Sequence, residues 1–357
     1  MLKLVGFSLL ALFSTERLAT VEGVYDYFRY HPMSEITEWM NQIVKDYPAL
    51  VTRVEYGMTY EKRTISLLKI GLNTGAKKYI VWMDCGIHAN EWIAPAFCQY
   101  FVNQILQSYK TDAKIKRMMK NLDFYVTPVL NVDGYIYSWK DNTTRQWRKN
   151  RRPGHSPGCY GTDLDRNFDV NWGMFTPLGA SFNCSSDMFC GTSPASEPEV
   201  EAVTNFIKSQ RANILSFLTI HSYGQMILLP YGDPNETVHN YEGLMKLGQD
   251  AAEAIWKVRG QNYTVGATSD VLYPISGLPR DLARMQGIPF CFTFVLRDNG
   301  TFSYQLPENQ IQPACEEAYS GVLHIITYAH NQIYSGAVAA TAATLWTLLL
   351  AAGVTLM

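Results

Sequence analysis

The segment Cys85-Gly86-Ile87-His88-Ala89-Asn90-Glu91-Trp92 decides how this chain is interpreted. An apolar run rich in β-branched and aromatic residues precedes it at residues 79–83, and a helical pattern starts within it at residue 92. The segment is therefore expected at a turn between a strand and a helix. His88 and Glu91 are three positions apart, so their side chains can converge at that turn, and both residue types bind zinc.

Strand-like runs and helical patterns alternate on both sides of this segment. The strand-like runs are residues 51–56, 64–70, 79–83, 122–130, 214–220 and 290–296. The helical patterns are residues 35–45, 92–108, 196–209, 241–258 and 313–329. This alternation predicts one α/β domain whose sheet carries helices on both faces. The stretches 142–194 and 264–287 are long and irregular, as functional loops often are.

The composition excludes several classes of protein. The 357 residues include 30 Lys and Arg against 32 Asp and Glu, a formal net charge of −2, and 47% are hydrophobic. These values are those of a globular protein and exclude disordered, collagen-like and coiled-coil chains. The near-neutral charge gives no electrostatic reason to expect nucleic acid as a partner. Nothing in the sequence indicates an oligomer, so a monomer is expected.

The two ends differ from ordinary domain sequence. One lysine, an apolar run at residues 4–13 and small or polar residues to position 20 predict a secretory signal peptide at residues 1–20. The alternative is a buried first helix. The single domain would then span residues 21–334.

At the other end, an uncharged apolar run follows Ser335-Gly336-Ala337 and continues to Met357. This pattern predicts that residues 335–357 form a GPI-anchor signal with Ser335 as the anchor residue, although the usual polar spacer is poor. The alternative is a membrane-spanning tail, for which the run is just long enough. The expected location is the extracellular face of the plasma membrane, held by a lipid anchor. The alternatives are a secreted protein or one with a spanning tail.

Glycosylation sequons and cysteines support secretion only weakly. Asn-X-Ser/Thr occurs at Asn142, Asn183, Asn235, Asn262 and Asn299. There are seven cysteines, and this odd number leaves at least one thiol free or intermolecular. In a chain of this length, disulfides would reinforce a core rather than replace one.

A third zinc ligand is available at the end of another strand. His221 follows the apolar run at residues 214–220, and with His88 and Glu91 it would leave the fourth zinc position open for water. One Zn²⁺ per chain is therefore expected. A bound zinc lowers the pKa of its water and polarises a carbonyl. Taken alone the pattern is weak, because a single histidine such as His221 is more often a hydrogen-bonded core residue.

The surrounding motifs make the interpretation specific. Besides residues 85–92, five motifs occur in order: Asn131-Val132-Asp133-Gly134-Tyr135, Trp147-Arg148-Lys149, Gly161-Thr162-Asp163-Leu164-Asp165-Arg166-Asn167-Phe168, His221-Ser222-Tyr223-Gly224 and Phe292-Thr293-Phe294-Val295-Leu296-Arg297-Asp298. Over about residues 24–334 the chain resembles the zinc metallocarboxypeptidases of the carboxypeptidase A/B group, and within it most resembles the carboxypeptidase O subfamily. The resemblance implies an α/β fold with a mixed, mainly parallel twisted sheet. It also implies hydrolytic removal of C-terminal residues from peptides or proteins. Unlike typical relatives, the domain at residues 21–334 is expected to lack an inhibitory pro-segment.

The resemblance also implies roles for further residues. Asp163 would accept a hydrogen bond from His88 and fix its tautomer. Arg148 would stabilise the oxyanion of the tetrahedral intermediate. Arg166 would bind the free carboxylate of the substrate. Tyr273 would close over the bound residue, and Tyr223 would line the neighbouring subsite.

Arg280 stands at the position that would face the substrate's terminal side chain. A buried arginine there would select a C-terminal Glu or Asp through a bidentate bond. The alternative is a solvated loop charge. The resemblance further implies two disulfides and an unpaired Cys190, and it leaves the state of Cys291 and Cys315 open. The implied disulfides are Cys85–Cys98 and Cys159–Cys184.

Three positions depart from the family pattern in the same pocket. The family's general base is a glutamate in Phe-Glu-Leu-Arg-Asp, but this chain has Val295 there, which cannot carry a proton. Asn90 replaces an arginine that helps bind peptide. Asp165 replaces an asparagine beside Arg166, and its carboxylate would repel the substrate's terminus. Two interpretations remain open: a slow zinc carboxypeptidase, or a non-catalytic protein that binds zinc and peptide C-termini.

Overall fold

Eight strands form one mixed sheet in the computed structural model, which describes residues 25–154 and 157–354 and the side chains as far as residue 334. The strands are β1 Val51–Met58, β2 Thr64–Ile70, β3 Tyr79–Cys85, β4 Leu122–Thr127, β5 Ile214–Ser222, β6 Met226–Leu229, β7 Thr264–Ala267 and β8 Phe290–Leu296. The helices are α1 Met33–Asp46, α2 Ile93–Thr111, α3 Ala113–Asn121, α4 Val132–Ser138, α5 Pro198–Gln210, α6 Tyr241–Arg259, α7 Thr268–Val271, α8 Pro279–Met285 and α9 Ile311–Val354, with short 3₁₀ turns at Leu164–Arg166 and Glu308–Gln310.

The centre of the sheet is parallel. The strand order is β1-β2-β4-β3-β5-β8-β6-β7. Strands β4, β3, β5 and β8 run parallel to one another, whereas β1 and β2 are antiparallel at one edge and β6 is antiparallel to β8 near the other. The expectation of a mixed, mainly parallel sheet in one α/β domain is confirmed.

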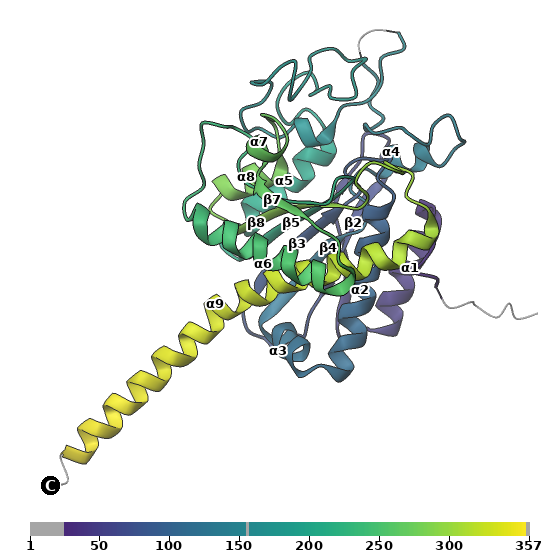
Figure 1. Cartoon of the computed structure of the whole chain (residues 1–357). Coiled ribbons are helices and arrows are strands. Elements are labelled where there is room, and N and C mark those ends of the chain that lie inside the picture. Colours follow the sequence, from purple (N-terminus) through teal and green to yellow (C-terminus); the bar gives the residue numbers. More distant parts are fainter. Residues whose placement is uncertain (1–24, 155–156, 355–357) are drawn as a thin grey trace, which may run out of the picture.

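Helices cover both faces of this sheet (Figure 1). On one face a large apolar cluster joins the strands to α1, α2, α3, α6 and α9. On the other face a smaller cluster joins them to α5 and α8. Because both faces are covered, the central strands are almost continuously buried, as β5 is along its whole length.

Most of the predicted elements match, and the differences have local causes. The run at 122–130 was expected as one strand, but β4 ends at Thr127 because Pro128 cannot donate to a ladder. The stretch 264–287, expected to be irregular, contains β7, α7 and α8. Strands β6 and β7 have four residues each, which is too short for alternation to indicate a strand.

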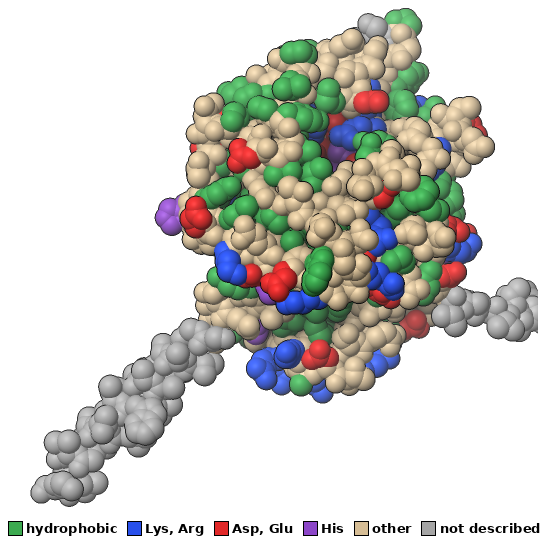
Figure 2. Space-filling view, in the orientation of Figure 1, with side chains coloured by type: hydrophobic (Ala, Val, Ile, Leu, Met, Phe, Trp, Pro, Cys, Tyr) green, Lys and Arg blue, Asp and Glu red, His purple; other side chains and the backbone are tan. Residues whose placement is uncertain are grey.

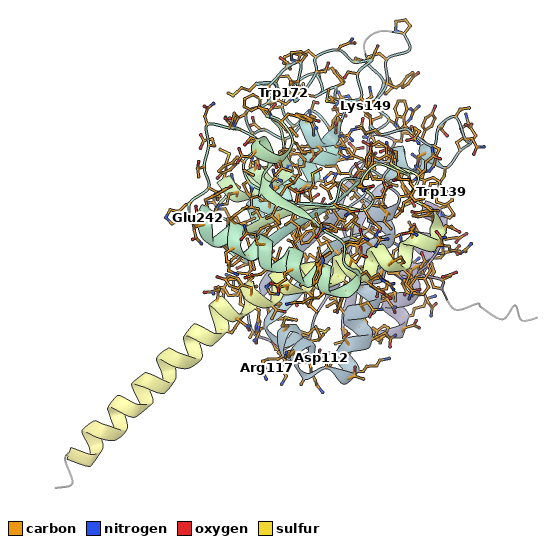
Figure 3. All side chains as sticks on the ribbon, viewed as in Figure 1. Asp112, Arg117, Trp139, Lys149, Trp172 and Glu242 are labelled. Atoms are coloured by element: carbon orange, nitrogen blue, oxygen red, sulfur yellow. A yellow bond between two sulfur atoms is a disulfide. The ribbon has the colours of Figure 1, made fainter. Side chains whose placement is uncertain are left out.

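Long loops gather at the end of the sheet where the central parallel strands finish. Lys149 and Trp172 lie in this loop layer, whereas Asp112 and Arg117 lie at the far end of the domain (Figure 3). Two disulfides are present, Cys85–Cys98 between β3 and α2 and Cys159–Cys184 within the loop layer. Both match the pairing that the resemblance implies. Cys190, Cys291 and Cys315 are buried free thiols.

The predictions for the two ends concern residues outside this description. The signal peptide at residues 1–20 lies outside the described residues, and so do the side chains of 335–357, including Ser335. Within the part that is described, no helix has the length and apolar character needed to cross a membrane. The asparagines of the five sequons are all exposed, which a glycan requires; their modification stays a prediction.

Candidate metal centre and substrate site

The three predicted ligands meet in the structure. Gly86 ends β3 with a φ of +65°, and this turn directs the chain to His88 and Glu91. His221 lies near the end of β5, which is parallel to β3, so the carboxyl ends of both strands reach the same edge. His88 Nδ1 is 2.8 Å from Glu91 Oε1, and His221 Nδ1 is 3.0 Å from Glu91 Oε2 and 3.1 Å from His88 Nδ1.

This arrangement fits a zinc ion. All three residues are buried, and one ligand atom from each lies within 4.8 Å of the others. Ligand atoms at about 2.0–2.2 Å from a tetrahedral centre lie roughly 3.3–3.6 Å apart. The observed separations of 2.8–3.1 Å are somewhat shorter, so the three side chains would move apart slightly to admit the ion. The two Nδ1 atoms face each other, so without a metal a proton must lie between them or their lone pairs repel. A zinc ion would instead use both lone pairs.

Asp163 and Arg148 surround the ligand set. Asp163 Oδ1 accepts from His88 Nε2 at 3.0 Å, so the Nδ1 lone pair of His88 faces the centre. Asp163 Oδ2 accepts from Arg148 Nε at 3.1 Å and Nη2 at 3.0 Å. Burial opposes the charge of Asp163, but Arg148, His88 and Arg166 together outweigh it and hold the pKa of Asp163 well below its usual range. Arg148 Nη1 also lies 3.7 Å from Glu91 Oε1.

Charges set the protonation of the ligands themselves. Burial and Arg148 lower the pKa of His88, but Glu91 and Asp163 more than offset them and raise it to about 8. Burial opposes ionisation of Glu91, yet His88 and His221 hold its pKa below the usual range. Ser222 also donates its backbone N–H to Glu91 Oε2 at 3.2 Å. Glu91 is therefore an anion in the metal-free protein.

Arg166 and Asp165 form a buried ion pair at the end of a short 3₁₀ turn. Arg166 Nη1 donates to the Asp165 carboxylate and to its backbone carbonyl, each at 3.0 Å. Among the described residues, nothing accepts from Arg166 Nε, although that atom is buried. Asp165 thus occupies one edge of the guanidinium, and the other edge keeps an unused donor.

Arg280 is buried rather than solvated. It lies in α8 with 2% of its surface exposed, so the alternative of a solvated loop charge is wrong. Its Nη1 donates to Thr293 at 2.9 Å, its Nη2 to Thr268 at 2.7 Å, and Nε and Nη2 both donate to Asp281. Four of its five N–H groups are therefore used, and one on Nη1 remains.

The segment before α8 packs closely against the backbone of Arg166. Gly277 has a φ of +78°, and a Cβ there would lie 2.1 Å from the carbonyl oxygen of Arg166. Its own carbonyl accepts from Phe168 N, and its N–H donates to Val170 O. Only glycine permits this close approach of the two backbones. The segment that leads into α8, the helix of Arg280, is therefore fixed against the segment that carries Arg166.

Val295 lies beside His221. The two residues are register partners in the parallel pair β5–β8, so their side chains are on the same face of the sheet. Val295 is 8% exposed. Asn90 is also buried; its amide donates to Gln146 O at 3.4 Å, and its Oδ1 has no partner among the described residues. Both departures from the family pattern thus lie close to the ligands.

The two tyrosines assigned to substrate contact are half-buried. The ring of Tyr223 meets the ring of Tyr304 edge-on at 5.0 Å. Tyr273 lies in the segment between α7 and α8. No contact in the structure joins Tyr273 to the ligand set, and its role stays a prediction.

Sequence reasoning missed two residues behind His221. Thr219 Oγ1 lies 3.4 Å from His221 Nε2 and donates to Asp84 Oδ1 at 2.8 Å, while Trp82 Nε1 donates to Asp84 Oδ2 at 2.7 Å. Burial raises the pKa of Asp84 to about 6. The signal was available, because an aspartate inside the apolar strand at residues 79–85 is unusual for a buried position.

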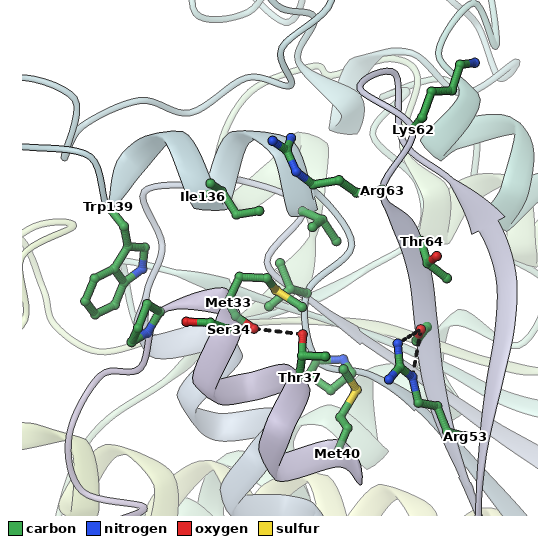
Figure 4. Close-up of a pocket in the computed structure, with 15 residues that line it drawn as sticks. Met33, Ser34, Thr37, Met40, Arg53, Lys62, Arg63, Thr64, Ile136 and Trp139 are labelled. Carbon is green, nitrogen blue, oxygen red and sulfur yellow. Dashed lines mark hydrogen bonds between the residues drawn. The ribbon is translucent and has the colours of Figure 1, made fainter.

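The surface has a hollow that contains histidine and charged side chains, and a separate cavity that the candidate ligands do not line. In the space-filling view, a hollow toward the top of the domain brings basic, acidic and histidine side chains together (Figure 2). A cavity of about 600 Å³ lies elsewhere, between α1, α4 and the strands β1 and β2 (Figure 4). Met33, Arg53 and Trp139 line it, and none of the three zinc-ligand residues does. That cavity is not part of the candidate site.

Fold and site together define a class of protein. A sequence profile described as zinc carboxypeptidase matches residues 36–321. The chain belongs to this zinc carboxypeptidase family, whose members are peptide-bond hydrolases.

Within this family, the chain is similar to particular proteins. The chain is 53% identical to carboxypeptidase O of Bos taurus over 310 residues, which are 87% of this chain and 81% of the relative. It is 51% identical to carboxypeptidase O of Homo sapiens over 323 residues, 90% and 85% of the two chains. Among solved structures it is similar to bovine thrombin-activatable fibrinolysis inhibitor bound to tick carboxypeptidase inhibitor. That TM-score is 0.79 at 38% identity, covering 86% of this chain and 99% of the other.

The first prediction concerns metal content. The purified protein should bind one zinc per chain, because three buried ligand atoms converge. Substitution His221→Ala should reduce bound zinc below stoichiometry. Elemental analysis after dialysis measures both, with His324→Ala as a control because His324 is not one of the three ligands. A metal content that is the same in the unmodified and His221→Ala proteins would contradict the assignment.

Proposed function

We propose that this protein binds one zinc ion, recognises peptide C-termini and hydrolyses the terminal peptide bond slowly, with a preference for a C-terminal Glu or Asp. The observation that carries this proposal is the convergence of His88, Glu91 and His221. When bound there, zinc supplies an activated water and polarises the scissile carbonyl. Anchoring of the substrate, stabilisation of the oxyanion and selection of the terminal residue are assigned to side chains of the protein.

Arg166 is the proposed anchor for the substrate's free carboxylate. Its Nε is buried without a partner among the described residues, and a carboxylate on the Nε edge would satisfy it. Asp165 on Nη1 already neutralises part of the charge. The anchor should therefore be weaker than an arginine without a carboxylate beside it.

Arg148 is the proposed stabiliser of the oxyanion. It lies next to Glu91 and is held by Asp163 through two hydrogen bonds, so its guanidinium is fixed before the substrate arrives. A preorganised donor of this kind lowers a barrier because it needs no reorientation during the reaction.

Arg280 is the proposed selector of acidic ends. It is buried, and one N–H on Nη1 remains for a substrate carboxylate. Asp281 neutralises part of the guanidinium charge of Arg280. Selection of an acidic end therefore depends on the free N–H, and on a substrate carboxylate replacing the Thr293 and Thr268 hydroxyls as hydrogen-bond acceptors. A charge-assisted bond is worth about 1.5–3 kcal/mol.

Val295 is the reason to expect slow turnover. Valine has no group that takes a proton from water or returns one to the leaving amine, and such transfer contributes about 10²–10⁴-fold. The carboxylates nearby are already engaged: Asp163 by Arg148 and His88, and Asp165 by Arg166. Neither is free to act as a base without first losing a partner.

A non-catalytic binding protein is the second candidate. The Asp165–Arg166 pair and Val295 favour it, because the first weakens carboxylate binding and the second removes proton transfer. In this case the zinc would serve to bind a peptide carbonyl or carboxylate.

The proposed location is the extracellular face of the plasma membrane, where a lipid anchor at Ser335 would hold a monomer. The signal-like residues 1–20, the hydrophobic tail and the exposed sequon asparagines support it. Secretion and a membrane-spanning tail are the alternatives.

The second prediction isolates proton transfer. Zinc-loaded Val295→Glu protein should cleave a Glu-terminated peptide about 10²–10⁴-fold faster than the unmodified chain. Val295→Gln is the matched control, because it has the shape of glutamate without its basicity. Cleavage by the unmodified chain within tenfold of Val295→Glu would mean that another base exists. Failure of both to cleave would favour the binding-protein candidate.

The third prediction concerns the terminal side chain. The unmodified protein should bind a Glu-terminated peptide roughly tenfold or more tightly than the isosteric Gln-terminated peptide, because only the first presents a carboxylate to Arg280. Titration calorimetry measures both affinities. The preference should disappear in Arg280→Gln, provided that its thermal unfolding shows a folded protein. Equal affinities in the unmodified protein would refute the assignment.

The fourth prediction concerns the anchor. A phosphatidylinositol-specific phospholipase should release the full-length protein from the surface of cells that express it, because only a lipid linkage is cleaved by this enzyme. Ser335→Leu should reduce surface display if Ser335 is the attachment residue. Retention of the protein after phospholipase treatment would favour a spanning tail instead.

A further inference from the structure

We infer that Asp84, acting through the Thr219 hydroxyl, is a positioning residue for the metal ligand His221. The inference rests on the proposed zinc site and adds a residue pair that neither the family motifs nor the sequence analysis assigns. To bind a metal, His221 must present a lone pair on Nδ1, the ring nitrogen that faces Glu91 and His88.

The tautomer of His221 decides whether this lone pair exists. A neutral imidazole carries one proton, so a lone pair on Nδ1 requires the proton on Nε2, and a buried N–H needs an acceptor. Within the described part of the chain, the acceptor offered to His221 Nε2 is Thr219 Oγ1, at 3.4 Å. The contact is long compared with the usual 2.9–3.0 Å, so the orientation of the hydroxyl is important.

Asp84 fixes that orientation. An ionised carboxylate only accepts hydrogen bonds, so the proton of the Thr219 hydroxyl must point to Asp84 Oδ1, which it meets at 2.8 Å. The lone pairs of Thr219 Oγ1 then remain for His221 Nε2. The hydrogen-bond direction runs from His221 to Thr219 to Asp84, and the opposite tautomer of His221 would place its Nε2 lone pair against those of the hydroxyl.

The sheet makes this arrangement rigid. Asp84 and Thr219 are register partners in the parallel pair β3–β5, and His221 is two residues further along β5, so the three side chains share one face. Trp82 on the same face donates to the second Asp84 oxygen at 2.7 Å. Both carboxylate oxygens are thereby held in place.

The burial of Asp84 is unfavourable for folding by itself, which indicates a role at the metal site. The residue is 1% exposed, and no Lys or Arg pairs with it among the residues described. A buried carboxylate without a cation is unfavourable, so its neutral donors alone do not explain it. The positive charge of a zinc centre two side chains away would compensate it. His88 has the matching arrangement in direct form, with Asp163 on its Nε2.

The test compares two isosteric substitutions. Thr219→Val removes the hydroxyl and keeps the shape, whereas Thr219→Ser keeps the hydroxyl. We expect Thr219→Val and Asp84→Asn to bind zinc about tenfold more weakly than the unmodified protein, at the lower end of the 10–100-fold seen for groups behind metal ligands. Thr219→Ser should stay within about threefold. Competition with a chromophoric chelator gives the dissociation constants, and the visible spectrum of the Co²⁺-substituted protein reports the ligand geometry.

Ser216→Ala is the structural control, because it removes another buried hydroxyl of β5, which donates to Phe290 O at 3.0 Å, without touching Asp84, Thr219 or His221. It should lower the thermal unfolding temperature of the metal-free protein but leave zinc affinity and the Co²⁺ spectrum unchanged. If Thr219→Val binds zinc as tightly as Thr219→Ser, the inference is wrong even though the zinc site stands. If the unmodified protein binds no zinc, the proposed function itself fails. If Asp84→Asn does not fold, the comparison of zinc binding by Thr219→Val and Thr219→Ser still tests the inference.

Discussion

Parallel pairing of β3, β5 and β8 is the constraint on which the rest of the site depends. Because these three strands run in one direction, their carboxyl ends reach the same edge, and loops that are distant in sequence meet there. Register then sets the details. His221 is opposite Val295, so a change in either strand would move a zinc ligand relative to the position that faces it.

The same face of these strands changes character along its length. Trp82 and Phe217 belong to the apolar cluster under α5 and α8, and their rings stack at 6.0 Å. Two residues further on, Asp84 and Thr219 form a polar layer, and Thr293 in that layer accepts from Arg280. Apolar packing thus holds the polar layer in place, and the polar layer in turn faces the ligands.

Buried charge in this site is almost entirely paired. Arg148 is shared by Asp163 and Glu91, Arg166 by Asp165, and Arg280 by Asp281. Paired charges are fixed in position, which suits binding of a transition state with developing charge. The pairing also has a consequence for chemistry, because a carboxylate held by a guanidinium is a weak base. We therefore expect that these neighbours do not supply the base that the family pattern has at the position of Val295.

The sequence by itself determined the α/β class and the candidate ligands His88, Glu91 and His221, because strand periodicity and short motifs are local properties. Both disulfide pairs came from the resemblance, since spacing alone does not fix a pairing. The resemblance supplied the roles of Asp163 and Arg148. The structure shows the hydrogen bond between Asp163 and His88 and the one between Arg148 and Asp163, and the role of Arg148 stays a prediction. The short strands β6 and β7 could not be predicted, since four residues carry too little pattern.

Only the tertiary structure decided which residues distant in the sequence form hydrogen bonds and ion pairs with one another. It placed Arg280 in a buried network rather than in solvent, joined Asp165 to Arg166, and set Asp84 behind His221 through Thr219. These relations join residues as many as 135 positions apart in the chain. They arise from strand register and from the close approach of backbones at Gly277, and a one-dimensional pattern contains neither.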